Sequence, residues 1–332
     1  MTTIYRPFRP SDQASLVSLW NLCLHRDPIN EDVFRHKVLL DPNLDLEGFW
    51  VAEREGELVG AALGLVRRTS LGDLGLETER GWISFLFVHP AWQHQGIGKG
   101  LLEHVLGFFT TRQRQLVQVV GYAPYYFFPG VDPEAYPAGL AFFKKNGFRR
   151  SFEAVAMARS IEELEIPAEV RERRLALKAQ GYEVDFLRDQ DILPLLAFTR
   201  REFPGWYPSV LDGLQRGFQQ KIVVARKGDE VVGFAQWENT FNDPPAGAPG
   251  RFGPFGVRAD LRSQGLGSVL FYYLLEAVRR RGARYLWLGW AGGRNINFYR
   301  RAGLAVTRHF EVLQLELNNL GEEQAERGES RG

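Results

Sequence analysis

Two short glycine-containing segments carry the residues best suited to binding a charged ligand. The first reads Q-H-Q-G-I-G-K from Gln93 to Lys99, and the second reads R-S-Q-G-L-G-S from Arg262 to Ser268. Each follows an apolar stretch and precedes an amphipathic one, which is typical of a strand, a tight turn and a helix. The first N–H groups of a helix lack intrahelical partners and lie at the positive end of its dipole, and glycine lets a ligand approach the backbone closely. The spacing therefore predicts two anion-binding turns.

Other phosphate-binding motifs fit these segments less well. The first segment lacks the leading glycine and the Ser or Thr of a P-loop, and neither segment contains G-x-G-x-x-G. For one isolated copy, a plain strand-to-helix turn without a ligand is an equally good interpretation. Two copies in the same context favour a ligand.

The two segments belong to a longer internal repeat. Residues 49–60, F-W-V-A-E-R-E-G-E-L-V-G, are echoed by V-V-A-R-K-G-D-E-V-V-G at 223–233. Residues 142–148, F-F-K-K-N-G-F, are echoed by F-Y-R-R-A-G-L at 298–304. The landmarks follow one order in both copies, so we expect a duplicated domain, with an aromatic and proline-rich insertion at 122–136 in the first copy.

The same series of elements is expected to position the turns in each copy. Strands are expected at 4–9 and 182–188, hairpins at 50–66 and 222–238, apolar strands at 82–88 and 251–257, helices at 98–111 and 267–281, further strands at 116–121 and 285–290, and last strands at 152–159 and 307–317. A short helix carrying an aromatic pair precedes each last strand. Helices interleaved with a mixed sheet predict an α/β fold.

Periodicity and composition also predict the limits of the domains. We expect a first domain over residues 1–160 and a second over 181–318. Residues 161–180 are charged and helix-prone after a proline, which predicts a helical linker. Residues 319–332 have almost no apolar side chains, which predicts a disordered tail.

Composition excludes several classes of protein. The 332 residues carry a formal net charge of +1, which gives no sequence-wide attraction for nucleic acid or an anionic membrane. The start of the chain lacks the apolar core of a signal peptide, a single cysteine cannot form an internal disulfide, and no apolar run is long enough to span a membrane. The six histidines show no zinc-ligand spacing. We therefore expect a cytoplasmic protein without nucleic-acid or membrane partners and without a metal.

The turns resemble the coenzyme-binding signature of the GNAT superfamily of N-acetyltransferases. The family pattern is V-x-P-x-x-Q/R-x-x-G-x-G/A. The first copy meets it at Val88, Pro90, Gln93, Gly96 and Gly98, and the second copy meets it at Val257, Arg262, Gly265 and Gly267 with Ala259 in place of proline. The resemblance implies two tandem GNAT-like domains, each a mixed, mostly antiparallel sheet flanked by helices, in an arrangement similar to that of the mycothiol synthases.

The resemblance further implies acetyl-CoA as the co-substrate and the amine of a small molecule or peptide as the acceptor. In the family, the pyrophosphate lies on the turn and the pantetheine arm pairs with the strand before it. The residues implied to bind acetyl-CoA in the first copy are Leu86, Phe87, Val88, Gln93, His94, Gln95, Gly96, Ile97, Gly98 and Lys99. In the second copy they are Phe255, Gly256, Val257, Arg262, Ser263, Gln264, Gly265, Leu266, Gly267, Ser268 and Asn295.

The same resemblance distinguishes the two copies in catalysis. Tyr299 lies where the family places a proton donor for the departing thiolate, and Phe143 occupies the matching position in the first copy without a hydroxyl. We therefore expect the chemistry in the second copy, with Tyr299 and Glu238 as the candidate catalytic residues. Glu238 is the candidate general base, although a strand-end carboxylate without a catalytic role is the simpler interpretation.

Two functions remain open on the sequence. One is a tandem N-acetyltransferase, which Tyr299 favours. The other is a non-catalytic protein that binds or senses acetyl-CoA with two degenerate GNAT-like modules, which Phe143 makes credible for half of the chain. The sequence leaves the acceptor and the oligomeric state undetermined.

Overall fold

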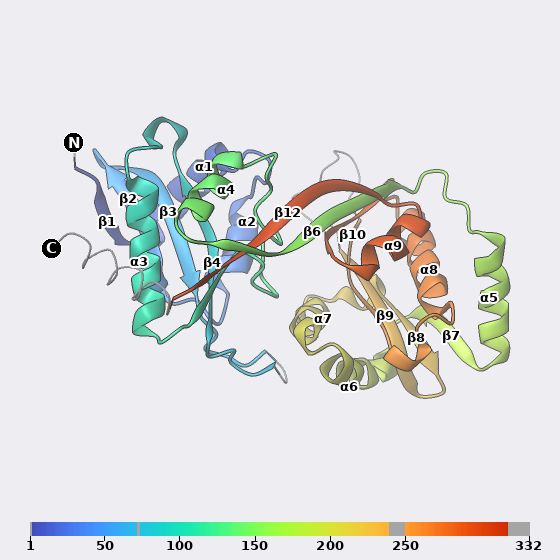
Figure 1. The fold of residues 1–332 in the computed structure, drawn as a ribbon. Coiled ribbons are helices and arrows are strands. Elements are labelled where there is room, and N and C mark those ends of the chain that lie inside the picture. The colour runs from blue at the N-terminus through green and yellow to red at the C-terminus, as the bar shows by residue number, and fades with distance from the viewer. Residues whose placement is uncertain (1, 72–73, 239–249, 318–332) are drawn as a thin grey trace. The chain divides into compact units, whose positions relative to one another are not determined.

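The computed structural model describes residues 2–71, 74–238 and 250–317 (Figure 1). Its contacts divide the chain into two compact units. Unit 1 comprises Met1–Thr69, Leu76–Ala154 and His309–Gly332, and unit 2 comprises Ser70–Gly75 and Val155–Arg308. The tail expected at 319–332 lies outside the described residues. No helix in the described ranges is long and apolar enough to cross a membrane.

The sheet of unit 1 is mixed and mostly antiparallel. Its strands, in spatial order, are β1 (Ile4–Pro7), β2 (Phe49–Arg54), β3 (Glu57–Leu65), β4 (Arg80–Val88), β5 (Leu116–Val119) and the end of β12 (Ala305–Glu316). Only β4 and β5 pair in parallel among these described strands. The connection between them is a crossover that contains a helix, as parallel neighbours require.

Helices cover both faces of the unit 1 sheet. They are α1 (Gln13–Cys23), α2 (Glu31–Phe34), α3 (Ile97–Thr111) and α4 (Pro137–Lys145). Leu101, Val105 and Phe109 of α3 pack in one apolar cluster with Ile83 of β4. Trp20 of α1 packs in a second cluster with the strand residues of the opposite face. Alternate side chains of a strand point to opposite faces, so the same strands supply both clusters.

The aromatic insertion at 122–136 contributes to the core of unit 1. Tyr122 is 1% exposed, and Phe127 and Phe128 pack against the same cluster as Trp20. The ring centroids of Trp20 and Phe127 are 4.6 Å apart. The insertion therefore packs within its own unit.

Unit 2 repeats this plan. Its strands, in spatial order, are the end of β6 (Arg149–Ser160), β11 (Tyr285–Ala291), β10 (Arg251–Val257), β9 (Glu230–Glu238), β8 (Ile222–Lys227) and β7 (Tyr182–Phe186). Its helices are α5 (Ala168–Ala179), α6 (Ile192–Glu202), α7 (Tyr207–Gln215), α8 (Leu266–Arg280) and α9 (Arg294–Arg301). Both units confirm the expected α/β class, with a mixed sheet flanked by helices.

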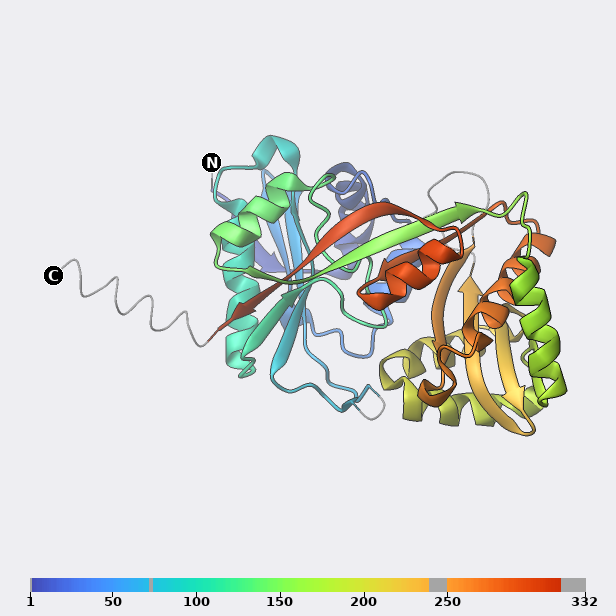
Figure 2. The same ribbon diagram turned by 45° about the vertical axis from the view of Figure 1, so that its right-hand side comes forward.

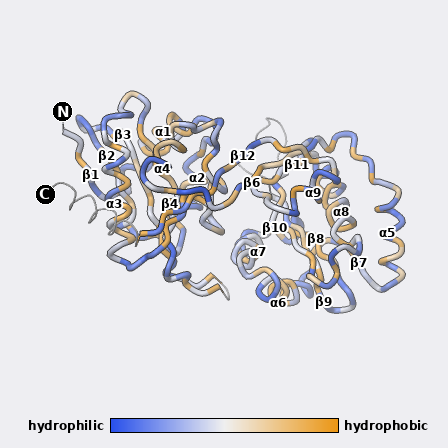
Figure 3. The backbone as a smooth tube through the Cα atoms, in the orientation of Figure 1, coloured by the Kyte–Doolittle hydropathy of each residue, from blue (hydrophilic) through white to orange (hydrophobic). Residues whose placement is uncertain are grey.

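The two faces of the unit 2 sheet are covered by different helices. Val223 and Ala225 of β8 pack in the cluster that holds α8, and Ile222 and Val224 pack in the cluster that holds Phe198 of α6. Hydrophobic residues recur along α8, β8 and β9 (Figure 3). Helix α5 lies beside α8 in both ribbon views (Figures 1 and 2), and its Val170 and Leu177 are buried in the α8 cluster.

The last strand of each repeat pairs with the sheet built mainly from the other repeat. Strand β6 follows α4 along the chain, yet its residues 155–160 pair with β11, including Arg159 opposite Leu286. Strand β12 follows α9, yet its end pairs with β5, including Leu313 opposite Val119. The two repeats therefore exchange their C-terminal strands, and the compact units do not end where the repeats end.

Candidate functional site

The first glycine turn has the geometry expected of an anion-binding helix start. Strand β4 ends at Val88, a 3-10 turn spans Pro90–Trp92, and α3 begins at Ile97 with Gly96 as its N-cap. Gly96 has a φ of +83°, a left-handed conformation that glycine adopts without strain. The Gln93 side chain donates from Nε2 to the Val88 carbonyl at 3.2 Å and fixes the turn to the end of the strand.

The second turn reproduces the first residue by residue. Strand β10 ends at Val257, a 3-10 turn spans Ala259–Leu261, and Gly265 caps α8 with a φ of +81°. Arg262 Nε donates to the Val257 carbonyl at 3.1 Å, as Gln93 does to Val88. The predicted equivalence of the two segments is therefore seen in their backbone and in their side-chain hydrogen bonds.

Both turns hold a non-glycine residue in the left-handed region. His94 has a φ of +60° and Ser263 has a φ of +63°, at matching positions two residues before the N-cap glycine. Such conformations are uncommon for residues with a side chain and are concentrated at functional sites. The turn therefore has the same unusual backbone in both copies despite different side chains.

The second glycine of each turn faces an aromatic ring from the short helix that follows the central strands. A Cβ on Gly98 would lie 3.4 Å from Phe142 of α4, and a Cβ on Gly267 would lie 3.8 Å from Phe298 of α9. In unit 2 the ring of Phe255 lies on the same side of Gly267, 3.7 Å from the same Cβ position. The start of the helix, the strand and the short helix therefore meet at this glycine, and a Cβ there would make ordinary van der Waals contacts.

The strand before each turn is hydrogen-bonded on one side only over its last residues. Pairing of β4 with β5 runs from Arg80 to Ile83, and pairing of β10 with β11 is confined to Arg251 opposite Trp287. Beyond these points, within the described residues, the two strands pair only with β3 and β9. One edge of residues 84–88 and one edge of 253–257 are thus open to an added extended chain. The predicted residues at 86–88 and 255–257 lie on these open edges.

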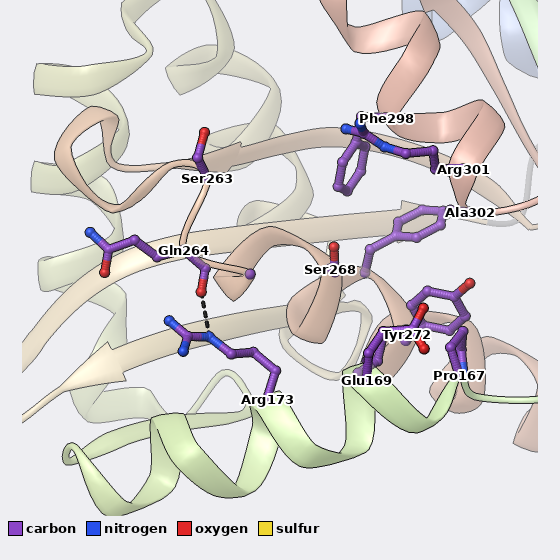
Figure 4. A pocket seen from close by; sticks show the side chains of 13 residues that line it. Pro167, Glu169, Arg173, Ser263, Gln264, Ser268, Tyr272, Phe298, Arg301 and Ala302 are labelled. Carbon is purple, nitrogen blue, oxygen red and sulfur yellow. Dashed lines mark hydrogen bonds between the residues drawn. The ribbon is translucent and has the colours of Figure 1, made fainter.

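A pocket of about 520 Å³ lies beside the second turn. Its wall is formed by the turn, α8, α9 and α5 (Figure 4). The lining residues are Pro167, Glu169, Val170, Arg173, Ser263, Gln264, Gly265, Ser268, Phe271, Tyr272, Phe298, Arg301 and Ala302. Four of the predicted binding residues, Ser263, Gln264, Gly265 and Ser268, are thus brought to one cavity. The sequence patterns did not identify α5 as part of this pocket. The cluster of arginines after Pro167 is the one sequence signal that could have indicated an anion-binding role for this helix.

Tyr299 lies in an aromatic cluster next to the open strand. Its side chain is 8% exposed, and its ring centroid lies 5.8 Å from Phe252, 5.9 Å from Phe271 and 5.2 Å from Phe298. Its hydroxyl makes no hydrogen bond to any residue in the described ranges. Burial raises the pKa of Tyr299 well above its ordinary value, so the phenol is neutral at physiological pH.

Phe143 fills the matching place in unit 1. It is 5% exposed, and its ring centroid lies 5.4 Å from Phe142 and 5.2 Å from Phe148. The position therefore carries a buried ring in both units, but only unit 2 has a hydroxyl there.

Several other predicted residues do not line the pocket beside the second turn. Asn295 is an exposed residue at the start of α9 and does not line the cavity. The backbone of Glu238 ends β9 opposite Arg251, and its side chain is outside what the structure describes. In unit 1, His94 and Lys99 are exposed, and Lys99 pairs with Glu103 at 3.5 Å.

Arg54 is a residue near the first turn that the sequence did not indicate. Its Nη1 donates to Gln95 Oε1 at 2.8 Å, and its guanidinium lies 4.8 Å from the centroid of Trp92. Arg54 reaches the turn from the end of β2, 41 residues earlier in the chain. Only folding brings the two together.

Comparisons with known proteins define the class. Residues 45–150 match the model of the acetyltransferase (GNAT) domain, and residues 192–304 match the model of the acetyltransferase (GNAT) family. The chain belongs to the GNAT acetyltransferases and carries two of their domains in tandem.

Solved structures share this tandem fold. A GCN5-related N-acetyltransferase from Sphaerobacter thermophilus is 21% identical with a TM-score of 0.68, and the alignment covers 95% of each chain. A tandem GNAT protein of the clavulanic acid biosynthesis pathway is 17% identical with a TM-score of 0.65, over 95% of this chain and 98% of that one. A GCN5-related glucosamine N-acetyltransferase region of a fungal GH3 β-N-acetylglucosaminidase is 21% identical with a TM-score of 0.80, over 95% of this chain and 38% of that one.

Sequence similarity to a curated relative is shorter. An acetyltransferase of Pectobacterium atrosepticum is 33% identical over 103 residues, which are 30% of this chain. The match spans 62% of the length of that relative.

Proposed function

We propose that this protein transfers the acetyl group of acetyl-CoA to the amine of a small molecule or peptide, and that the reaction takes place in unit 2. The observation that carries the proposal is the Tyr299 hydroxyl, which has no hydrogen-bond partner in the described structure and lies in an apolar cluster beside the open strand. Unit 1 has Phe143 at this position.

The turn and the open strand suit the two ends of the co-substrate. Backbone N–H groups at the start of α8 and the positive end of its dipole favour the pyrophosphate. The open edge of residues 255–257 offers backbone groups to the amides of pantetheine, which would pair as an added strand does. A backbone N–H near Val257 would then polarise the thioester carbonyl as the acetyl group is attacked.

The reaction requires one bond to form and one to break. The neutral amine nitrogen attacks the acetyl carbon, a C–N bond forms, and the C–S bond breaks with its electron pair on sulfur. The nitrogen loses its extra proton to a base or to water, and the coenzyme thiolate finally takes a proton from solvent. An acceptor amine with an ordinary pKa near about 10 must be deprotonated before it attacks.

The burial of Tyr299 bears on how its hydroxyl would act. Because burial raises the pKa of Tyr299, complete transfer of its proton to a thiolate is unfavourable, since the conjugate thiol has an ordinary pKa of about 8.5. It can donate a hydrogen bond to the charge that develops on sulfur. Tyr299 is therefore proposed as a hydrogen-bond donor to the leaving group, which restricts the proton-donor role that the family resemblance implied.

An aromatic segment supports an acceptor site on the other side of β10. The Phe203 ring packs against Gly256, where a Cβ would come within 2.5 Å of it. Trp206 stacks on Phe203 with ring centroids 4.8 Å apart. This wall is next to the strand that would hold the thioester, so residues 203–206 are placed to contact the acceptor.

Unit 1 is proposed to bind acetyl-CoA without turning it over. Its turn and open strand match those of unit 2, and it has Phe143 where unit 2 has the Tyr299 hydroxyl. This assigns the non-catalytic binding function to one half of the chain and leaves catalysis to the other.

A pair of matched variants tests where the reaction occurs. Gly98→Glu and Gly267→Glu each place a side chain and a negative charge beside one turn, at positions where a Cβ makes ordinary contacts of 3.4 Å or more. Thiol release from acetyl-CoA is measured with a panel of primary amines and short peptides. Glucosamine is included because the fungal region of similar fold is described as a glucosamine N-acetyltransferase. Loss of turnover in Gly267→Glu alone is the expected result, whereas loss in Gly98→Glu alone would place the reaction in unit 1.

A further inference from the structure

Helix α5 does more than connect the two repeats, because it forms one wall of the pocket at the second turn. Pro167, Glu169, Val170 and Arg173 all line that pocket. The helix is fixed in place by Val170 and Leu177, which are 8% and 3% exposed and lie in the unit 2 core. A wall that is anchored in this way is a stable part of the site.

Arg173 makes direct contact with the turn. Its Nε donates to the backbone carbonyl of Gln264, as the dashed line in Figure 4 marks. Its side-chain stem crosses Gly265, where a Cβ would lie 2.8 Å from Arg173 Cγ. The guanidinium is therefore held at the residues whose backbone N–H groups begin α8.

Arg173 does not pair with Glu169, the nearest acidic residue on its own helix face. Glu169 lies four residues earlier on the same helix, a spacing at which Glu and Arg commonly pair. No ion pair joins them in the described structure, and Arg173 bonds the turn instead. The terminal nitrogens of Arg173 have no partner among the described residues, so they remain free to bind an anion.

A second unpaired cation lines the pocket from α9. Arg301 forms no ion pair or hydrogen bond within the described ranges, and Figure 4 shows it on the side of the pocket away from α5. Glu169 is the one carboxylate among the lining residues, so the lining carries two positive charges and one negative charge. This balance suits a ligand with several negative charges.

Among the described residues, no side chain lies over Gly96 of the first turn as Arg173 lies over Gly265. A Cβ on Gly96 would meet nothing within 4 Å, whereas its counterpart Gly265 is in contact with Arg173. The two turns share their backbone but differ in what lies over them.

We propose that α5 belongs to the coenzyme site of unit 2 and that Arg173 binds the phosphates of acetyl-CoA there while it holds the Gln264 carbonyl. The proposal rests on the proposed function of unit 2 and adds a ligand-binding residue from outside the glycine motif. It predicts that coenzyme affinity in unit 2 depends on α5, for which the described residues of unit 1 show no counterpart over Gly96.

The test isolates the second turn in the full-length Gly98→Glu chain. Acetyl-CoA is titrated calorimetrically into this parent, into the parent with Arg173→Ala, and into the parent with Arg171→Ala. Arg171 is a matched control because it is exposed on the same helix, carries the same charge and, among the described residues, bonds only the Ile166 carbonyl. S-acetylpantetheine, which has no phosphate, is the second probe. Thermal unfolding of each variant checks that the fold is kept.

A lost charge-assisted hydrogen bond predicts a rise in the Kd for acetyl-CoA of roughly ten- to a hundred-fold in Arg173→Ala. Arg171→Ala should leave the Kd within about two-fold of the parent, and binding of S-acetylpantetheine should be equal in all three chains. Equal weakening by both substitutions, an unchanged Kd in Arg173→Ala, or tighter binding in that variant would overturn the role of Arg173. A parent that does not bind acetyl-CoA at all would overturn the proposed coenzyme site of unit 2 together with it.

Discussion

Phe298 of α9 lies 3.8 Å from the position that a Cβ would occupy on Gly267. The contact brings the short helix up to the start of α8, and a Cβ at 267 would make ordinary van der Waals contacts there. The same relationship joins Phe142 and Gly98 in unit 1 at 3.4 Å. These two glycines are therefore better test positions than Gly265, whose φ of +81° strains any other residue.

Both turns are expected to bind acetyl-CoA, and the two glycine variants separate them. Calorimetry should report two sites for the natural chain and one for Gly98→Glu or Gly267→Glu, because each new carboxylate repels the phosphates at one turn. The double variant should bind none. An unchanged stoichiometry in Gly267→Glu would show that the second turn holds no coenzyme.

Tyr299→Phe should reduce kcat more than it reduces coenzyme affinity. The hydroxyl is proposed to donate a hydrogen bond to the charge that develops on sulfur during C–S cleavage. Its removal should therefore destabilise the transition state more than the bound coenzyme. A lost hydrogen bond to a charged group predicts a decrease in kcat of roughly ten- to a hundred-fold. Steady-state thiol release gives kcat, and calorimetry gives the Kd for acetyl-CoA separately. Full turnover in this variant would mean that Tyr299 only packs in the aromatic cluster.

Phe143→Tyr should not create activity in unit 1. The Phe143 ring is 5% exposed and packs on Phe142 and Phe148, so an added hydroxyl has no arranged partner. Overpacking and an unsatisfied hydroxyl predict a loss of about 1–3 kcal/mol in the free energy of unfolding. Denaturant titration measures the stability, and turnover is measured in the Gly267→Glu background. Turnover in that background would show that the missing hydroxyl alone makes unit 1 inactive.

Stability in acid should depend on Asp12 of unit 1. Its carboxylate caps the backbone N–H of Arg9 at 2.8 Å and accepts two hydrogen bonds from Arg6, at 2.7 and 3.0 Å. The bond from Arg6 lowers the pKa of Asp12, so the carboxylate stabilises the fold above its unfolded-state pKa of about 3.9. This contribution is lost as the pH falls through the lower folded-state value.

Comparison of Asp12→Asn with the natural chain measures this effect. The difference in the free energy of unfolding should be constant near neutral pH and should shrink below about pH 4. Asp32→Asn is the control, since the Asp32 side chain is 61% exposed in its pair with Arg35. A difference for Asp12→Asn that persists unchanged into strong acid would contradict the assigned cause.

Local sequence patterns were sufficient to locate the elements around the site. The expected strand at 251–257 matches β10 (Arg251–Val257), and the expected helices at 98–111 and 267–281 match α3 (Ile97–Thr111) and α8 (Leu266–Arg280) within one residue. Apolar periodicity identifies the buried face of each element, and the glycine at each N-cap marks where the helix begins. The equivalence of Gly96 and Gly265 follows from the same local signals.

The residues around the turns could not be found in this way. Arg173 and Gln264 are 91 residues apart, and Arg54 and Gln95 are 41 residues apart. A charged residue on the polar face of a helix has the same sequence signal whether it meets solvent or a loop. Packing of Val170 and Leu177 into the unit 2 core decides that Arg173 reaches the turn.

The sequence by itself determined that the chain is a duplication, because landmarks in the same order need no knowledge of contacts. Only the tertiary structure decided which repeat receives each C-terminal strand. Strands β6 and β12 occupy matching positions in the two repeats, so local preference does not distinguish pairing within a repeat from exchange. Each central strand needs a hydrogen-bonded neighbour on its free edge, and either copy of the last strand can satisfy it. The pairing of Leu313 with Val119 and of Leu286 with Arg159 is therefore set by the global path of the chain.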